Sequence, residues 1–209
     1  MSKRRRRTVD KWKGKEWYMI QTPSYFGNLD IGETIASNSE KIVGRRVETT
    51  LYDITNDFNQ IHVKLLFQIT EVKNKIAYTE YQGHVFTRDY LRSLIRRGSS
   101  RIDGIFNVTT KDGYTLRLTA IVLTLSRAKT TQQHIIRKIM EDIIQKKAEE
   151  LTFQQFVQQV VLGKVGSEIY NAAKKITALR KCEIMKSKVT RVPEIVTEVT
   201  PEPISEAPA

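Results

Sequence analysis

The sequence is poor in residues that form disulfides, metal sites or nucleophilic active sites. Its 209 residues include one cysteine, Cys182, so neither an internal disulfide nor a zinc cluster of several thiolates can form. The three histidines lie far apart, with no carboxylate at ligand spacing, and the motifs H-E-x-x-H, C-x-x-C and G-x-S-x-G are absent. We therefore expect no metal, no cofactor and no small-molecule substrate. An active site assembled from distant residues, as in an RNA-acting enzyme, stays open as an alternative.

Long apolar segments are also missing. No run of apolar residues is long enough to cross a bilayer, and the basic N-terminus is not followed by the apolar stretch of a secretory signal. The single cysteine fits a reducing compartment. These absences predict a cytoplasmic protein without a membrane partner.

What the sequence does contain is positive charge. Lysine and arginine number 35 against 23 acidic residues, a net charge of +12. Residues 1–16 hold eight basic and two acidic residues, whereas residues 193–209 hold four glutamates, four of the five prolines and no basic residue. The chain between them is still basic. Such an excess indicates an acidic partner, with nucleic acid the usual one.

Neither end has enough apolar residues to offset the entropy of ordering it. We therefore predict a flexible basic arm at 1–16 and a disordered acidic Pro/Glu tail at 193–209. The single α+β domain between them, 17–192, would be the folded part.

The first half of that domain reads as strands. Residues 61–70, "IHVKLLFQIT", place Ile61, Val63, Leu65, Phe67 and Ile69 on one face, and residues 75–86 provide a partner strand. Asp112-Gly113 between two strand-like runs is a strong hairpin signal. Residues 44–54, "GRRVETTLYDI", also read as a strand. Short strands with frequent turns predict a β-rich, barrel-like body over 17–125.

The second half reads as helices. Residues 130–150 carry a wide apolar face that includes Ile135 and Ile136, with Thr130 or Thr131 as cap, and helices continue to 177. A strand returns at 179–192. One earlier helix, capped by Thr87 or Asp89 and stopped by Gly98, would carry Arg88, Arg92 and Arg96 as a stripe at a spacing of four.

Basic residues gather in separate segments, and their pattern favours phosphate contact. Tryptophan within the N-terminal arm could stack on unpaired bases. The candidate RNA-binding residues are Lys3, Arg4, Arg5, Arg6, Arg7, Lys11, Trp12, Lys13, Lys15, Arg45, Arg46, Arg88, Arg92, Arg96, Arg97, Arg101, Lys174, Lys175, Arg180, Lys181, Lys186 and Lys188. For the N-terminal arm, the alternatives are a nuclear import signal or a solubilising tail. For the arginines of the helix, the alternative is pairing with acidic residues elsewhere in the fold.

Sequence-specific duplex DNA readers concentrate their base contacts on one helix or ribbon, and no such element is evident here. Basic segments spread along the chain instead fit a component embedded in a large RNA. A chromatin-like DNA binder, or another non-ribosomal nucleic-acid-binding protein, is the alternative.

Several segments resemble one known family. "KEWYMIQTPSYFG", "KIVGRRVETTLYDI", "RDYLRSLIRRGSSRID", "VTTKDGYTLRLTAIVLT" and "KCEIMKSKV" are similar, in this order, to the archaeal and eukaryotic small-subunit ribosomal proteins of the eS-one (S-three-A-e) family. The resemblance runs from about Arg4 to Val192. Its most specific block matches the family pattern G-R-x-x-E-x-x-L-x-D through Gly44, Arg45, Glu48, Leu51 and Asp53. The short length and tail resemble the archaeal type.

This resemblance implies a non-enzymatic structural constituent of the small ribosomal subunit that supports translation in the cytoplasm. It also implies binding to small-subunit ribosomal RNA at the platform, near the messenger exit, beside neighbouring small-subunit proteins. Arg45 matches the family pattern and Arg46 departs from it, so Arg45 is the stronger RNA candidate of the two. Pairing of Arg45 with Glu48 or Asp53 inside the protein is the alternative.

Overall fold

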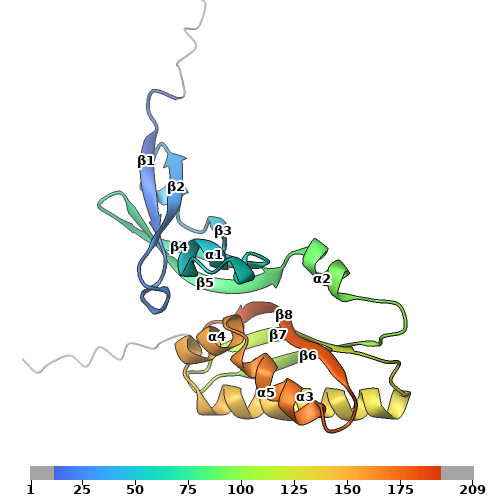
Figure 1. The fold of residues 1–209 in the computed structure, drawn as a ribbon. Helices are drawn as coiled ribbons and strands as arrows, with labels where there is room; N and C mark the ends of the chain where they lie inside the picture. Colours follow the sequence, from blue (N-terminus) through green and yellow to red (C-terminus); the bar gives the residue numbers. More distant parts are fainter. Residues whose placement is uncertain (1–11, 194–209) are drawn as a thin grey trace, which may run out of the picture.

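A computed structural model describes residues 12–193 (Figure 1). The strands are β1 (Glu16–Gln21), β2 (Asp30–Ala36), β3 (Arg46–Thr50), β4 (Val63–Lys73), β5 (Ile76–Phe86), β6 (Arg101–Thr109), β7 (Thr115–Thr124) and β8 (Leu179–Arg191). The α-helices are α1 (Leu51–Thr55), α2 (Arg88–Leu94), α3 (Thr130–Glu150), α4 (Phe153–Val161) and α5 (Lys164–Ala173). The predicted α+β class is confirmed, with a strand-rich first half, a helical second half and the returning strand. Residues 1–11 and 194–209, which hold most of the predicted arm and tail, lie outside the described residues.

All eight described strands belong to one mixed sheet that branches at β5. One edge of β5 pairs with β4 along nearly its whole length, and β3 pairs with β4 beyond it. The other edge is shared. Its first part, Ile76–Tyr78, pairs with β1 in parallel, and its last part, Gly83–Val85, pairs with β8. The upper unit in Figure 1 thus has the strand order β2-β1-β5-β4-β3, and the lower unit has β5-β8-β7-β6.

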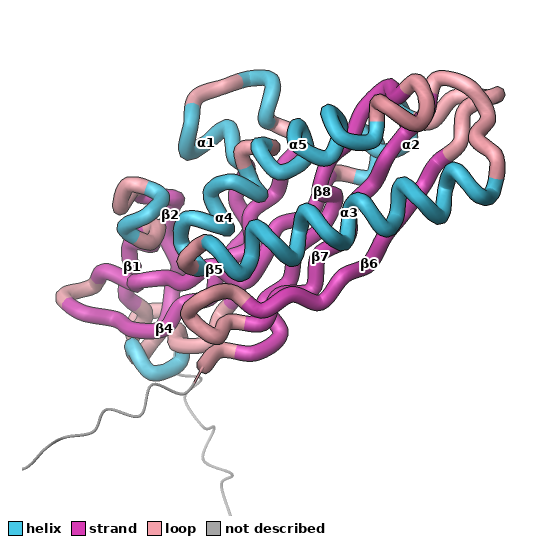
Figure 2. Tube along the Cα trace, turned by 90° about the horizontal axis from the view of Figure 1, so that it is seen from below, coloured by secondary structure: helices cyan, strands magenta, loops and turns pink. Residues whose placement is uncertain are grey.

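Three helices cover one face of the lower unit. Figure 2 shows α3, α4 and α5 side by side over the strands, with α3 running along β6. The buried side of α3 is the narrow stripe Ile136, Met140, Ile144 and Ala148, at a spacing of four. The wide apolar face that the sequence predicts is wrong in one respect, because Ile135 is 47% exposed. Ile135 comes one residue before Ile136, so its side chain lies about 100° around the helix axis from that stripe.

The predicted strand over 44–54 is also wrong beyond Thr50, where the chain turns into α1. The Thr50 side chain accepts from the backbone N–H of Asp53, and the Asp53 carboxylate accepts from the backbone N–H of Thr50. This reciprocal pair is a capping box, which satisfies donors that a starting helix leaves free. The hydrogen bonds that the Asp53 carboxylate accepts from Thr50 lower the pKa of Asp53. Leu51 is buried as the first residue of α1 rather than as part of a strand.

The arginine-bearing helix α2 is shorter than predicted. It begins after Thr87, as expected, but ends at Leu94, because Ile95 adopts an extended conformation. The Arg180 side chain donates to the carbonyl of Leu94, 3.2 Å away, which satisfies a group that the helix end leaves free. Arg96 therefore lies beyond the helix, and the predicted three-arginine helical stripe is reduced to Arg88 and Arg92.

Smaller corrections concern element ends. The N-cap of α3 is Lys129 rather than Thr130 or Thr131, and Ile61 precedes β4 and is 46% exposed. The predicted capping position Thr152 and the inward face of α4 are confirmed, as is the Asp112-Gly113 hairpin between β6 and β7.

The junction of β5 with β8 is unusually close. A Cβ placed on Gly83 would lie 2.3 Å from the carbonyl oxygen of Ser187, so only glycine fits there. Beside it, the ring of His84 contacts the Ser187 hydroxyl at 2.7 Å and the Tyr81 hydroxyl at 3.0 Å through Nδ1. Nε2 of His84 lies 2.9 Å from the carbonyl oxygen of Ile184. All these side-chain groups are buried, and burial lowers the pKa of His84 to about 4.

We predict that Gly83→Ala lowers the free energy of unfolding by about 2–4 kcal/mol, because the new methyl group meets backbone rather than a movable side chain. Urea unfolding followed by circular dichroism measures this. Gly14→Ala is the matched control, since a Cβ at Gly14 meets nothing within 4 Å. Equal midpoints for the two variants would contradict the close approach.

We also predict a loss of stability in mild acid. The folded-state pKa of His84, about 4, lies below its unfolded value of about 6.5, so the unfolded chain takes up the proton first. Stability is therefore fully present above about pH 6.5 and falls by about 3 kcal/mol as the pH drops to about 4. Urea titrations across this range measure it.

His62, whose pKa is also lowered by burial, contributes in the same direction. A His84→Asn variant isolates the share of His84, because its stability should depend less steeply on pH in this window. Identical slopes for wild type and variant would refute the assignment to His84.

Candidate nucleic-acid interface

Basic residues from distant parts of the sequence meet around one groove. Arg46 from β3 and Lys186 and Lys188 from β8 line a hollow of about 230 Å³, whose floor includes Leu66 and Val85. The strand order explains the meeting, because β4 and β5 lie between β3 and β8 in the sheet. More than 130 residues of sequence separate Arg46 from Lys186, but only two strands separate them in the fold.

Strand alternation holds these cations in solvent. On β8, Lys186 and Lys188 are exposed, whereas their neighbours Ser187 and Val189 are buried. Successive side chains of a strand point to opposite faces, so burying Ser187 in the β5 junction places both lysines on the outer face.

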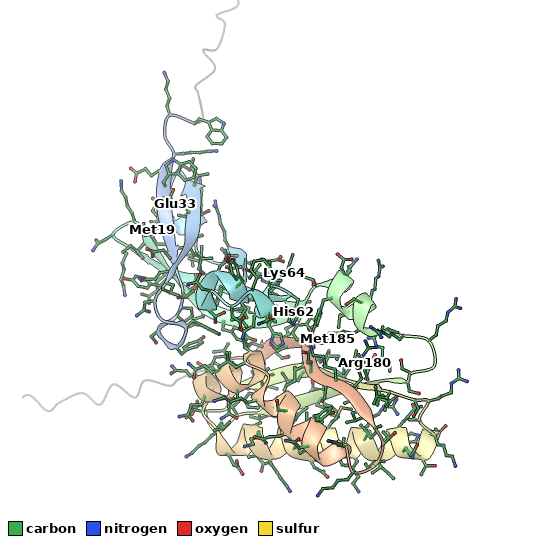
Figure 3. All side chains as sticks on the ribbon, in the orientation of Figure 1. Met19, Glu33, His62, Lys64, Arg180 and Met185 are labelled. Carbon is green, nitrogen blue, oxygen red and sulfur yellow. The ribbon has the colours of Figure 1, made fainter. Side chains whose placement is uncertain are left out.

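A second hollow, of about 490 Å³, continues this surface toward α2. It shares Leu66 and Val85 with the first and is also lined by Lys64 of β4 and Arg88 of α2. Acidic side chains are present as well. Lys64 forms an exposed ion pair of 3.7 Å with Glu48, and such exposed pairs contribute little to stability. Figure 3 labels Lys64 in the upper unit and Arg180 on β8 in the lower unit.

The neighbouring strand β7 adds Arg117, which is paired in register with Lys188 and donates a hydrogen bond to Asn107. We call the set Arg46, Lys64, Arg88, Arg117, Lys186 and Lys188 the basic sheet face. The sequence reasoning missed Lys64 and Arg117. Alternation already placed Lys64 on the polar side of its strand, but which strands are neighbours could not be read from the chain.

The arginines around α2 are open to solvent. Arg88, Arg92, Arg96 and Arg97 are exposed and form no ion pair with any residue in 12–193. Arg101 differs, because its guanidinium makes two contacts of 2.9 Å with the carboxylate of Asp103.

Two of the candidates hold α2 against β8. Lys181 forms a 2.8 Å ion pair with Glu183 and contacts the hydroxyl of Tyr90. Burial lowers the pKa of Lys181, but the hydrogen bonds to Glu183 and Tyr90 outweigh it and raise the pKa. Arg180 binds the carbonyl at the end of α2, as described above.

Arg45 also makes its contacts within the protein, although not with Glu48 or Asp53. Its Nε donates to the carbonyl of Lys41 at 3.0 Å, and one terminal nitrogen donates to Thr34 Oγ1 at 2.9 Å and to the carbonyl of Ile35 at 3.1 Å. Arg45 thereby links the start of β3 to β2. Contact of this exposed side chain with RNA stays a prediction.

The remaining candidates lie elsewhere. Lys13 and Lys15 precede β1, with Lys15 Nζ 3.8 Å from the ring centre of Trp12. Lys174 and Lys175 are exposed at the end of α5, on the helical side of the sheet. Lys3, Arg4, Arg5, Arg6, Arg7 and Lys11 lie outside the described residues.

Ser187 and Cys182, whose side chains are potential nucleophiles, are both buried in the fold. The contact between Ser187 and His84 is fully buried, and its neighbours are Tyr81 and a backbone carbonyl. Burial raises the pKa of Cys182 to about 12, so its thiol stays protonated. Within residues 12–193 no three potential metal ligands gather, and none of the helices there is long and apolar enough to span a membrane.

The chain is similar to known proteins over nearly its whole length. A sequence model of the Ribosomal S3Ae family matches residues 3–193. The "Small ribosomal subunit protein eS1" of Staphylothermus marinus is 50% identical over 194 residues, covering 92% of each chain. The protein of the same name from Saccharolobus solfataricus is 51% identical over 185 residues, covering 88% of this chain and 89% of its own length. The match spans nearly the whole chain at about half identity, and the protein therefore belongs to the ribosomal S3Ae family.

Proposed function

We propose that this protein is a structural constituent of the small ribosomal subunit and binds small-subunit ribosomal RNA through its basic sheet face. Family membership and the names of the archaeal relatives support the ribosomal role. The observation that supports RNA contact is the meeting of Arg46, Lys186 and Lys188 around one groove.

The chemistry of this face suits the backbone of RNA. Arginine presents a planar fork of donors that matches phosphate oxygens, and lysine adds a compact charge. Each phosphate that such a group neutralises releases counterions, which drives binding at low salt. All six defining residues are lysine or arginine, which suits contact with the phosphate backbone rather than readout of base identity.

The sheet also makes the face rigid. Arg46, Lys64, Lys186 and Lys188 stand on paired strands, which fixes the spacing between them. Exposed Arg92, Arg96 and Arg97 extend the positive surface along and beyond α2. A rigid array of cations suits a protein that holds RNA helices in a fixed arrangement.

The family resemblance supplies the finer proposals. We place the protein at the platform of the small subunit, near the messenger exit, in the cytoplasm and beside other small-subunit proteins. The basic N-terminal segment, including Trp12, Lys13 and Lys15, would contact the same RNA. No enzymatic step is part of this proposal, and incubation of purified protein with ribosomal RNA should leave the RNA intact.

The variant R46Q/K186Q/K188Q should bind a ribosomal RNA fragment more weakly and with less dependence on salt. The slope of log K against log salt concentration is negative, and removal of three phosphate contacts reduces its magnitude by about two to three. Fluorescence anisotropy across a salt series measures both quantities.

The matched control is K111Q/K138Q/K146Q, which removes three exposed lysines outside the basic sheet face. It lowers the net charge equally and should change the slope much less. Equal effects of the two triple variants would show that binding depends on net charge alone and would overturn the assignment to this face.

A second prediction concerns subunit assembly. R88E/R92E should reduce incorporation into small subunits, because both side chains are exposed and replacing them with carboxylates repels phosphate. Sedimentation of tagged protein in sucrose gradients measures incorporation. Thermal melting checks the fold, and normal incorporation with unchanged melting would show that these arginines are only solvated.

A further inference from the structure

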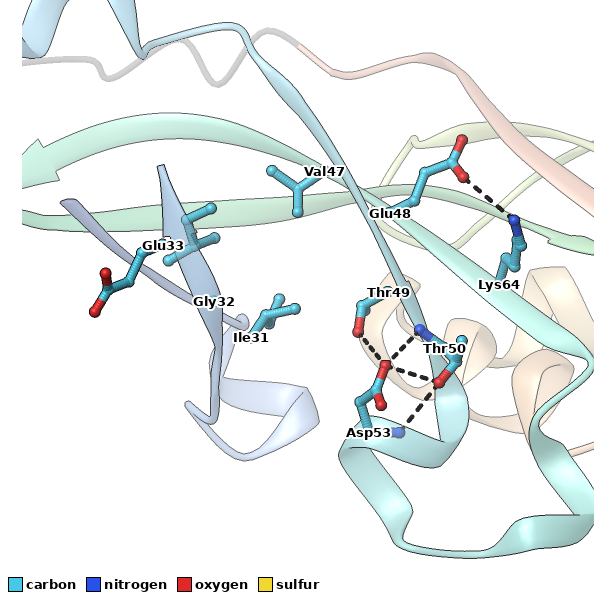
Figure 4. Close-up of a pocket in the computed structure, with 10 residues that line it drawn as sticks. Ile31, Gly32, Glu33, Val47, Glu48, Thr49, Thr50, Asp53 and Lys64 are labelled. Carbon is cyan, nitrogen blue, oxygen red and sulfur yellow. Dashed lines mark hydrogen bonds and ion pairs between the residues drawn. The ribbon is translucent and has the colours of Figure 1, made fainter. Parts of the chain in front are cut away.

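The upper unit is a barrel-like sheet that is left open on one side. β2 and β3 are the two ends of the strand order β2-β1-β5-β4-β3, and neither pairs with another strand within residues 12–193 on its outer edge. A cleft of about 440 Å³ lies between these two edges (Figure 4). An unpaired strand edge offers backbone donors and acceptors to any further strand.

On β2, the backbone of Glu33 faces the cleft. The carbonyl of Ile35 accepts a hydrogen bond from Arg45, so it points away from β1. Backbone groups two residues apart in a strand point the same way, and the pairing with β1 is regular over this stretch. The N–H and C=O of Glu33 are therefore directed at the open edge.

On β3, the backbone of Glu48 is directed at the same opening. The carbonyl of Arg45 accepts from the N–H of Ile69 at 2.9 Å, so residues 45, 47 and 49 turn their backbone groups toward β4. The intervening residues face outward. The N–H of Thr50, on this outer edge, is already bound to the Asp53 carboxylate, which leaves Glu48 available.

The side chains of the cleft differ from the rest of the surface. Ile20, Ile31 and Val47 supply apolar area, and Glu33, Glu48 and Asp53 bring three carboxylates. Among the described lining residues, Lys64 is the one base. The cleft is therefore acidic in a protein with a net charge of +12, and it would repel RNA phosphate.

We propose that this cleft binds an extended segment of a partner protein in which basic and apolar residues alternate. The segment would add a strand between β2 and β3. Its backbone would pair with Glu33 and Glu48, its apolar side chains would cover Ile31 and Val47, and its cations would meet the carboxylates. Charge complementarity selects this occupant over an acidic or neutral strand. The proposal shares only Lys64 with the basic sheet face and stands independently of RNA binding.

The probe is a fluorescein-labelled, end-capped ten-residue peptide of alternating lysine and valine, titrated with the full chain. Fluorescence anisotropy should show saturable binding, with the amides of Glu33 and Glu48 protected from hydrogen exchange. A peptide of the same sequence, N-methylated at alternate backbone nitrogens, keeps charge and side chains but loses edge donors. It should bind at least about tenfold more weakly, because main-chain pairing supplies most of the affinity.

E33Q/E48Q should weaken binding of the unmethylated peptide by about three- to tenfold, since two partly exposed charge pairs are lost. E141Q/E150Q removes two exposed carboxylates of α3 and is the control for net charge. It should leave binding unchanged. RNA binding measured in parallel should not weaken in E33Q/E48Q, which separates this test from that of the proposed function.

Four results would overturn the proposal. Equal binding of the methylated peptide would replace strand addition with diffuse attraction, and equal weakening in both double variants would place the peptide elsewhere. The third concerns the chain's own basic residues 1–11. If peptide binds only after these residues are removed, the occupant is the protein's own N-terminal segment. Absence of binding to both the full and the shortened chain would also refute it.

Discussion

The close approach of β5 and β8 at Gly83 is the contact on which the rest of the fold depends. β5 belongs to both units of the sheet, and its residues Gly83, His84 and Val85 pair with β8. A side chain at Gly83 would force the strands apart, and the buried group of Tyr81, His84 and Ser187 fixes their register with directed hydrogen bonds. A hydrophobic contact alone would tolerate a slip of the strands, whereas this polar group does not.

The register at this junction also determines the surface. Because Ser187 points inward to His84, Lys186 and Lys188 must point outward, where they line the same groove as Arg46, two strands away on β3. A slip of one residue would bury the lysines and expose Ser187. The positive face is thus a consequence of the buried hydrogen bonds. The acidic cleft between β2 and β3 adjoins this face, because Lys64 lines both and forms an ion pair with Glu48 of the cleft.

The sequence predicts much of the fold because alternation and helical periodicity are local. The hairpin at Asp112-Gly113 and the helices after 130 follow from short patterns, as do the strands predicted at 61–70 and 75–86, which the structure places at 63–73 and 76–86. The errors arise where two local signals compete. Val47 and Thr49 read as strand up to Thr50, but the Thr50–Asp53 capping box starts a helix in the same segment. Likewise, the helical pattern through Arg96 ends early, where Ile95 is extended and Arg180, far away in the sequence, binds the carbonyl of Leu94.

The candidate site was harder to predict for the same reason. Charge identifies which residues are basic, but not which of them are already engaged. Arg45, Arg101, Arg180 and Lys181 have partners inside the protein, and only the folded structure separates them from the exposed arginines of α2. Lys64 and Arg117 went unnoticed because each stands alone in its segment, and strand pairing gives each of them basic neighbours.

β8 is the last described strand in the chain, yet it lies between β5 and β7 in the sheet. Strands β1 to β5 leave a protein-synthesising ribosome first, with the Gly83 edge of β5 still unpaired. The lower sheet cannot be completed until residues 179–191 emerge. The pairing of β8 with β5 joins residues far apart in the sequence and is therefore slow to form. The two lysines that complete the positive groove arrive on that same strand. A chain that stops short of β8 consequently lacks both the finished sheet and the finished groove, so the fold itself keeps incomplete chains from presenting the full set of cations.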